Sequence, residues 1–183
     1  GGDVGKLRGV ADQLNLVSES LVKLHPVSEP MAQALVNAVD VTVRSGKPPA
    51  TELAMEAAQA ALAACAAQGA KVTALMVDSE NVPIVLISAD GGVLTERLAA
   101  SKARIAVKTG MSSAEAGERA KTDPAFAAQI KADPYMSAAF SGALPVTMGG
   151  EKAGAFAVGG GSVAGQDEAC AKAGLAKIQD RLR

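Results

Sequence analysis

Aromatic side chains are nearly absent from this sequence. They make up 2% of its 183 residues, with no tryptophan and a single tyrosine. Proteins that bind single-stranded nucleic acid stack bases on aromatic rings, so this class is disfavoured. An excess of one charge is lacking too, because 18 basic residues nearly balance 19 acidic ones and leave a net charge of −1. Such a chain has no electrostatic footprint for nucleic acid or an anionic membrane, and we expect no nucleic-acid partner.

Long hydrophobic runs and metal ligands are also scarce. No stretch of the sequence approaches the roughly 18 apolar residues of a membrane span, so we expect no membrane partner. One histidine and two cysteines are too few for a typical structural zinc site, and we expect no metal. The favoured interpretation of Cys65 and Cys170, each in an alanine-rich helical segment, is two small buried hydrophobic side chains. A disulfide between them is the alternative, and it would require an oxidising compartment.

The cellular compartment stays open. The chain begins with Gly1 and Gly2 rather than methionine, so we expect a processed or engineered product. Removal of a signal peptide would make the protein periplasmic or secreted, and otherwise it would be cytoplasmic.

Small aliphatic residues are what the sequence has in abundance. Hydrophobic residues make up 49% of the chain although aromatics contribute so little. The core must therefore consist of alanine, valine, leucine and isoleucine packed closely together. A chain of this length suits one domain with an appendage.

The appendage is predicted to be an N-terminal helical hairpin. Apolar residues in 4–24 recur at alternating spacings of three and four, which predicts an amphipathic helix that ends at Pro26. A second helix is expected to begin at Ser28, a good N-cap. The prolines after Lys47 indicate a linker. We therefore divide the chain into a helical hairpin extension, residues 1–47, and a ligand-binding domain, residues 48–183.

Two pairs of short apolar runs predict two β-hairpins. Residues 72–78 and 82–88 flank a Ser-Glu-Asn turn, and Pro83 predicts that its strand begins there or lies at an edge. Further along, apolar runs flank a tight turn at Gly149-Gly150. Helices are expected at 52–68, at 93–109 and from Gln166 onward. Three shorter helical pieces are expected after the capping residues Ser112, Asp123 and Asp133. This order predicts an α+β fold with a single antiparallel sheet flanked by helices.

A run of three glycines, Gly159, Gly160 and Gly161, separates the last strand from the last helix. Such a run lets the backbone approach a ligand or a neighbouring subunit closely. A dinucleotide site is disfavoured, because no βαβ unit follows and the acidic first turn of the last helix, with Asp167, repels a phosphate.

The helix at 93–109 is basic. Arg97, Arg104 and Lys108 lie on roughly the same side, and an arginine there could hold a carboxylate or a propionate in bidentate fashion. A merely solvated face is the alternative. Tyr135 and Met136, further along, are residue types that ligate haem in other proteins, although their segment could simply pin a loop over the sheet edge.

Four blocks of sequence carry a family resemblance. They are VTALMVDSENVPIVLIS, SKARIAVKTG at 101–110, SGALPV at 141–146 and GEKAGAFAVGGGSVAGQDEACAKAGL at 150–175. In this order, and within residues 52–182, they resemble the GlcG/HbpS-like family, which includes haem-binding proteins and the C-terminal part of PduO-type proteins. The resemblance implies a sheet of about five strands flanked by helices, and assembly into a homo-oligomer. It also implies that haem or another small molecule binds in a groove near the glycine turn and the basic helix.

The matching blocks suggest which residues form this groove. Cationic side chains would neutralise the acid groups of the ligand, and small residues would shape the wall. The proposed ligand-binding residues are Lys102, Arg104, Gly142, Pro145, Gly159, Gly160, Gly161 and Asp167. Residues 48–183 contain no histidine, so a histidine ligand to haem could come only from His25 or from another chain.

Two other functions stay open. An enzyme, such as a lyase, an isomerase or a haem-degrading enzyme, could use the same cleft, with Asp167, Lys102 or Tyr135 as its acid or base. Alternatively the chain is an assembly module, in which the N-terminal apolar seam builds the oligomer. The sequence assigns no catalytic residue, ligand identity or subunit number.

Overall fold

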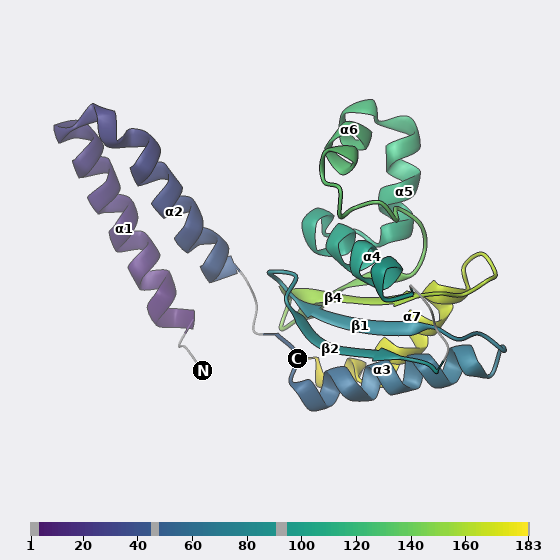
Figure 1. The fold of residues 1–183 in the computed structure, drawn as a ribbon. Coiled ribbons are helices and arrows are strands. Elements are labelled where there is room, and N and C mark those ends of the chain that lie inside the picture. Colours follow the sequence, from purple (N-terminus) through teal and green to yellow (C-terminus); the bar gives the residue numbers. More distant parts are fainter. Residues whose placement is uncertain (1–3, 45–47, 91–94, 183) are drawn as a thin grey trace. The chain divides into compact units, whose positions relative to one another are not determined.

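The computed structural model describes residues 4–44, 48–90 and 95–182. Contacts within the chain group it into two units, Gly1–Ser45 and Gly46–Arg183, and each is described by itself (Figure 1). Among the helices of the described residues, none is long and apolar enough to cross a membrane.

The N-terminal unit is a pair of packed helices, as the apolar spacing predicts. α1 (Val4–Leu24) and α2 (Glu29–Arg44) contact each other and are joined by a 3₁₀ turn at Pro26–Ser28. Ser28 does not act as the expected N-cap. It lies within this turn, and its hydroxyl donates to the backbone oxygen of His25 at 2.7 Å.

The larger unit is built on one antiparallel sheet with the strand order β2-β1-β4-β3. Its strands are β1 (Thr73–Asp78), β2 (Pro83–Ser88), β3 (Ala143–Met148) and β4 (Glu151–Gly159). The α+β class and the single antiparallel sheet are confirmed. The expected count of about five strands was slightly too high, because the described residues form four, all from the four apolar runs that predicted two hairpins.

Prolines mark both edges of this sheet. β2 is an outer strand that begins at Pro83, as predicted, and β3, the other outer strand, contains Pro145. A proline has no backbone N–H to donate to a neighbouring strand, so it is tolerated at a sheet edge.

Helices cover both faces of the sheet, as Figure 1 shows. α3 and α7 lie against one face and α4 lies against the other, with α5 and α6 beyond α4. Their bounds are Thr51–Ala66 for α3, Thr95–Thr109 for α4, Ser113–Thr122 for α5, Pro124–Ala132 for α6 and Gln166–Ala176 for α7, and a 3₁₀ turn at Gln179–Arg181 follows.

The alternation of side chains along the strands divides the core into two layers. In β1, Ala74 and Met76 pack with α3 and α7, whereas Leu75 and Val77 pack with α4. The layer between β4 and α4 consists mainly of alanines: Ala99, Ala103, Ala106, Ala155 and Ala157. Because these side chains are small, α4 packs closely on the sheet, and side chains on its inner face are deeply buried.

The segment after α6 departs from the prediction. A third capped helix was expected at Asp133-Pro134, by analogy with the capping box of Ser112 and the cap at Asp123, which are both confirmed. The chain instead forms a turn. The carboxylate of Asp133 accepts a hydrogen bond from the backbone N–H of Tyr135 at 3.0 Å and another from Nε of Arg104 at 2.7 Å. Asp123 also binds an arginine, but its other oxygen accepts from the backbone N–H three residues on, whereas that of Asp133 accepts from the N–H two residues on, which closes a turn and not a helix.

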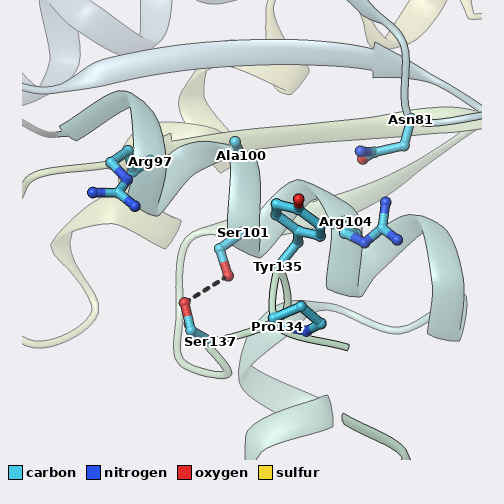
Figure 2. A pocket seen from close by; sticks show the side chains of 8 residues that line it. All are labelled: Asn81, Arg97, Ala100, Ser101, Arg104, Pro134, Tyr135 and Ser137. Atoms are coloured by element: carbon cyan, nitrogen blue, oxygen red, sulfur yellow. Dashed lines mark hydrogen bonds between the residues drawn. The ribbon is translucent and has the colours of Figure 1, made fainter. Parts of the chain in front are cut away.

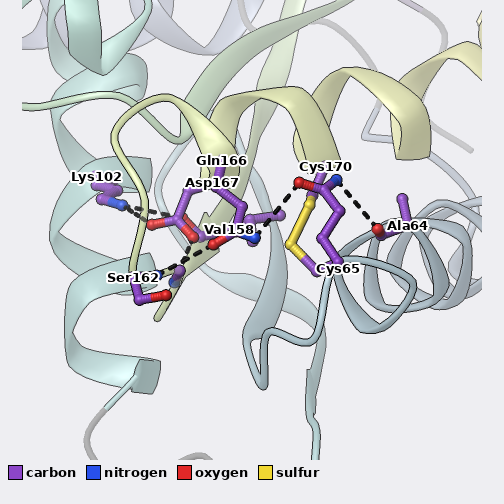
Figure 3. The surroundings of a disulfide bond; sticks show 10 residues. Ala64, Cys65, Lys102, Val158, Ser162, Gln166, Asp167 and Cys170 are labelled. Atoms are coloured by element: carbon purple, nitrogen blue, oxygen red, sulfur yellow. Dashed lines mark hydrogen bonds and ion pairs between the residues drawn. A yellow bond between two sulfur atoms is a disulfide. The ribbon is translucent and has the colours of Figure 1, made fainter.

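The two cysteines form a disulfide, so their favoured interpretation as separate buried side chains was wrong. Cys65 near the end of α3 and Cys170 in α7 are joined at 2.07 Å, with their Cα atoms 5.6 Å apart (Figure 3). Both cysteines are fully buried. Helical pattern alone could not detect the pairing, because it depends on how α3 and α7 approach each other in space.

Replacing both cysteines with alanine removes a cross-link between positions 105 residues apart. We expect the free energy of unfolding to fall by about 2–5 kcal/mol, as measured by urea denaturation followed by circular dichroism. A reducing agent should destabilise the wild-type protein to a similar extent and leave the variant unchanged. A variant as stable as the oxidised wild type would contradict the cross-link.

Candidate functional site

Several of the predicted ligand-binding residues gather around one buried ion pair. Nζ of Lys102, on α4, lies 2.5 Å from Oδ2 of Asp167, on α7, and donates a second hydrogen bond to the backbone oxygen of Val158 at 3.2 Å. The Lys102 side chain is 0% exposed and that of Asp167 is 9% exposed. Figure 3 shows this pair beside the first turn of α7.

The same turn of α7 holds the glycine run. The second oxygen of Asp167 accepts a hydrogen bond from the backbone N–H of Gly161 at 2.7 Å, and Oε1 of Gln166 accepts one from Ser162 at 3.1 Å. Asp167 stands at the N-terminal end of α7, where the helix dipole favours a negative charge. Both of its oxygens are therefore engaged within the chain.

The glycines make the close approaches expected of them, but to the chain itself. A Cβ at Gly142 would lie 2.7 Å from Nζ of Lys102, and one at Gly161 would lie 2.7 Å from Oδ1 of Asp167. The other glycines of the run face the start of α4 in the same way: Gly159 and Gly160. Their packing is explained without a ligand, and their role in binding stays a prediction.

The ammonium group of Lys102 is fully enclosed by its own chain. Burial lowers the pKa of Lys102 below its usual value, and the hydrogen bond and charge of Asp167 act in the opposite direction. The ring of Phe140 lies 4.6 Å from Nζ, a favourable cation–π distance. The cation is thus surrounded by a carboxylate, a carbonyl and a ring of its own chain. In this arrangement Lys102 links α4 to α7.

Arg104 lies elsewhere, at a cavity beside the outer side of α4. This cavity has a volume of about 400 Å³ and is shown in Figure 2. Its walls come from α4, from the loop after α6 and from the turn between β1 and β2. The lining residues are Asn81, Arg97, Ala100, Ser101, Arg104, Pro134, Tyr135 and Ser137.

Arg104, in one wall of this cavity, is paired with the carboxylate of Asp133. Burial acts to raise the pKa of Asp133, but the hydrogen bonds from Arg104 and the backbone of Tyr135 outweigh it and hold the pKa below its usual value. Asp133 therefore stays ionised at neutral pH. The guanidinium of Arg104 also lies 5.5 Å from the centre of the Tyr135 ring, which fixes it between an anion and an aromatic face.

A second arginine on α4 has no such partner. No described residue forms an ion pair or hydrogen bond with the guanidinium of Arg97, an exposed residue that lines the cavity. Arg97 and Arg104 line the same cavity, as their spacing on the helix indicated, whereas Lys108 does not. A free guanidinium of this kind is able to bind a carboxylate through bidentate hydrogen bonds.

Pro145 lies in neither place. It lines a second cavity of about 560 Å³ between β3 and α7, beside Leu144, Leu175 and Lys172. The structure thus distributes the eight predicted residues over three locations. Met136 is buried in the apolar cluster of α4, α5 and α6, so its sulfur is not available as a ligand, whereas Tyr135 is 70% exposed.

Sequence reasoning missed three polar residues of the Arg104 cavity. Ser101 and Ser137 approach each other at 3.5 Å across one wall, and Ser101 accepts a hydrogen bond from the backbone of Ala138. Asn81 reaches the cavity from the β1–β2 turn, with a φ of 65°. An asparagine in a strand-to-strand turn was the available signal, since asparagine tolerates this backbone conformation.

The fold places the chain among α+β proteins with one antiparallel sheet between two layers of helices. Solved structures share it. HbpS is 29% identical, covering 72% of this chain and 90% of its own, with a TM-score of 0.65. A double mutant of HbpS from Streptomyces reticuli is 30% identical, covering 72% of this chain and 87% of its own, with a TM-score of 0.63. PduOC, solved as a haem complex, is 20% identical, covering 72% of this chain and 95% of its own, with a TM-score of 0.66. At this identity the likeness supports the fold alone.

The sequence itself also matches a family model. Residues 50–176 match the family described as "Haem degrading protein HbpS-like". The chain belongs to this HbpS-like family, which confirms the resemblance seen in the four sequence blocks. A comparison with curated proteins gives no significant match.

The ion pair predicts a distinctive pattern of stability. Lys102→Met leaves the Asp167 carboxylate buried without a cation, and we expect the free energy of unfolding to fall by about 3–5 kcal/mol. The double variant Lys102→Met/Asp167→Asn should recover part of the loss, because asparagine can still accept the hydrogen bond from Gly161. Urea denaturation at pH 7 measures all three proteins.

A matched control is Lys121→Met, which removes an exposed ion pair with Glu118. We expect this variant to unfold like the wild type, since exposed pairs contribute little. Equal effects at Lys102 and Lys121 would show that the buried pair is not a stabilising link.

Proposed function

We propose that the protein binds haem or another small carboxylated molecule in the cavity beside α4. The observation that carries this proposal is the exposed, unpaired guanidinium of Arg97 beside Arg104 and the ring of Tyr135 in one cavity among the described residues. The family description names haem, and a structural relative was solved as a haem complex. The cavity volume of about 400 Å³ lies within the range typical of small-ligand sites.

The residues present fit the edge of a haem group. Arg97 would bind a propionate, and the Tyr135 ring, held beside Arg104, offers an aromatic face for the macrocycle. The phenol oxygen of Tyr135 is the cavity's own candidate for an iron ligand, because tyrosine is a known ligand of haem iron. His25 belongs to the N-terminal unit and is the sequence's single histidine, so it is the competing candidate.

Titration with haemin, followed by absorbance, tests the proposal. We expect a Soret band with the wild type at micromolar haemin, and roughly tenfold weaker binding for Arg97→Ala, because a hydrogen-bonded charge pair is lost. Tyr135→Phe should shift the band if the phenol binds the iron, whereas His25→Ala should not. Lys131→Ala, on the outside of α6, is the control for general charge effects.

Absence of any spectral change at micromolar haemin would exclude haem. Equal binding by the wild type and by Arg97→Ala would place the haem site outside this cavity.

We further propose that the protein forms a homo-oligomer through its N-terminal hairpin. Packing of α1 on α2 buries Ala32, but it leaves Val17 61%, Leu24 76% and Leu35 53% exposed. An amphipathic helix is stabilised when its apolar stripe is buried. α1 and α2 do not bury these exposed apolar side chains against each other. The same hairpin of a second copy would cover them in a bundle of four helices.

Charged substitutions in this stripe should weaken assembly. We expect Val17→Glu/Leu24→Glu to lower the molar mass of the particle in multi-angle light scattering, because each charge would be buried at the interface. Leu86→Glu, at an exposed leucine of β2, is the matched control and should leave the mass unchanged. An unchanged mass for the hairpin variant would show that the hairpin does not drive assembly. An oligomer that persists after deletion of residues 1–47 would show the same.

A further inference from the structure

Asn81 contains a buried hydrogen-bond acceptor that nothing in the described chain uses. Its Oδ1 is the one buried side-chain oxygen or nitrogen without a partner among the residues that the structure describes. The residue lines the cavity beside α4. Buried polar atoms in proteins are nearly always paired, so an acceptor in a cavity wall that no group of the described chain uses is available to a donor on a bound ligand or to water.

The turn that contains Asn81 does not need its amide. Oδ1 of Asp78 accepts hydrogen bonds from the backbone of Glu80 at 2.9 Å and of Val82 at 2.8 Å. The backbone N–H of Asn81 donates to the oxygen of Asp78 at 3.0 Å. The φ of 65° favours glycine or asparagine, and glycine would meet that need at lower strain. The amide is therefore surplus to the turn.

The amide points into the cavity together with the other polar groups. Figure 2 shows the Asn81 amide and the Tyr135 hydroxyl directed toward the same space, with the guanidinium of Arg104 beside them and Arg97 on the other side of the ring. A ligand that lies along the Tyr135 ring would thus meet a cation at one end and the acceptor of Asn81 at the other.

The charges at the cavity restrict the ligand further. Two guanidinium groups, Arg97 and Arg104, are set against one carboxylate, that of Asp133. One positive charge remains uncompensated, which suits a ligand with one carboxylate. The same charge disfavours an ammonium group on the ligand, so the donor for Asn81 has to be a neutral hydroxyl or amide N–H.

We propose that Asn81 is a specificity residue and that the cavity accepts monocarboxylic acids with a hydroxyl or amide N–H donor and a flat apolar part. This inference rests on the proposed carboxylate site and deepens it: of the two ligand classes proposed there, it selects the small carboxylated molecule over haem, which has two propionates and no such donor on its macrocycle edge. A site built to hydrogen-bond a ligand hydroxyl rejects the analogue that lacks it, since its own polar group is then left unpaired.

Mandelate and phenylacetate test the inference, because they differ only in one hydroxyl group. In isothermal titration calorimetry with the full chain, we expect the wild type to bind mandelate about tenfold more tightly than phenylacetate. Asn81→Gly keeps the turn and removes the amide, so it should bind the two acids with equal affinity. Asn81→Asp keeps an acceptor, and it should retain the preference for mandelate although both acids bind more weakly.

Two further measurements separate the failure of this inference from that of the carboxylate site. Arg97→Ala should weaken both acids equally, and phenylglycine, with an ammonium in place of the hydroxyl, should bind less tightly than mandelate. Equal affinity of the wild type for mandelate and phenylacetate overturns the role of Asn81 and leaves the carboxylate site standing. Failure of both acids to bind overturns the carboxylate site for this class of ligand, and the specificity inference with it. Unfolding of Asn81→Gly by urea, compared with the wild type, confirms that the turn is intact.

Discussion

The buried ion pair between Lys102 and Asp167 is the contact on which the arrangement of the larger unit depends. It connects α4 on one face of the sheet to the start of α7 on the other, and it does so beside Val158 at the end of β4. A dry ion pair is tolerated only when every donor and acceptor is matched. Here the backbone of Gly161, the carbonyl of Val158 and the ring of Phe140 complete the match, so the sheet and both helix layers are positioned by one polar cluster.

The start of α7 is anchored a second time, one turn further along the helix. Cys170 follows Asp167 by three residues and ties α7 to α3, while Asp167 ties it to α4. Glycine is required around this junction, because a side chain at Gly142 would occupy the space of the Lys102 ammonium. The glycine run that suggested a ligand turn is thus explained first by packing, and the open cavity lies beside the outer side of the same basic helix.

Much of the fold could be predicted from the sequence, because it rests on local patterns. The four apolar runs became the four strands, and the capping residues Ser112 and Asp123 began helices. Asp133 has the same Asp-Pro pattern, but its carboxylate closes a turn at Tyr135 and no helix follows, so the local pattern alone does not distinguish the two outcomes. The disulfide likewise depends on the distance between two helices and not on either helix alone.

The candidate site was predictable only in part. The basic helix was recognised, and Arg97 and Arg104 share a cavity as their spacing indicated. Lys102 sits three residues after Ala99 and four before Ala106, on the alanine face that packs on the sheet. That spacing was visible in the sequence, but burial of a lysine on an apolar face can be predicted only when its counter-ion is known. Asp167 supplies it from 65 residues away.

The prolines at the two sheet edges have a consequence for how copies of this protein can meet. A foreign strand aligned along β3 would find no amide hydrogen at Pro145, and one aligned along β2 would find none at Pro83. Each proline removes one hydrogen-bond donor from an outer strand, which disfavours the pairing of strands from two molecules at either edge of the sheet.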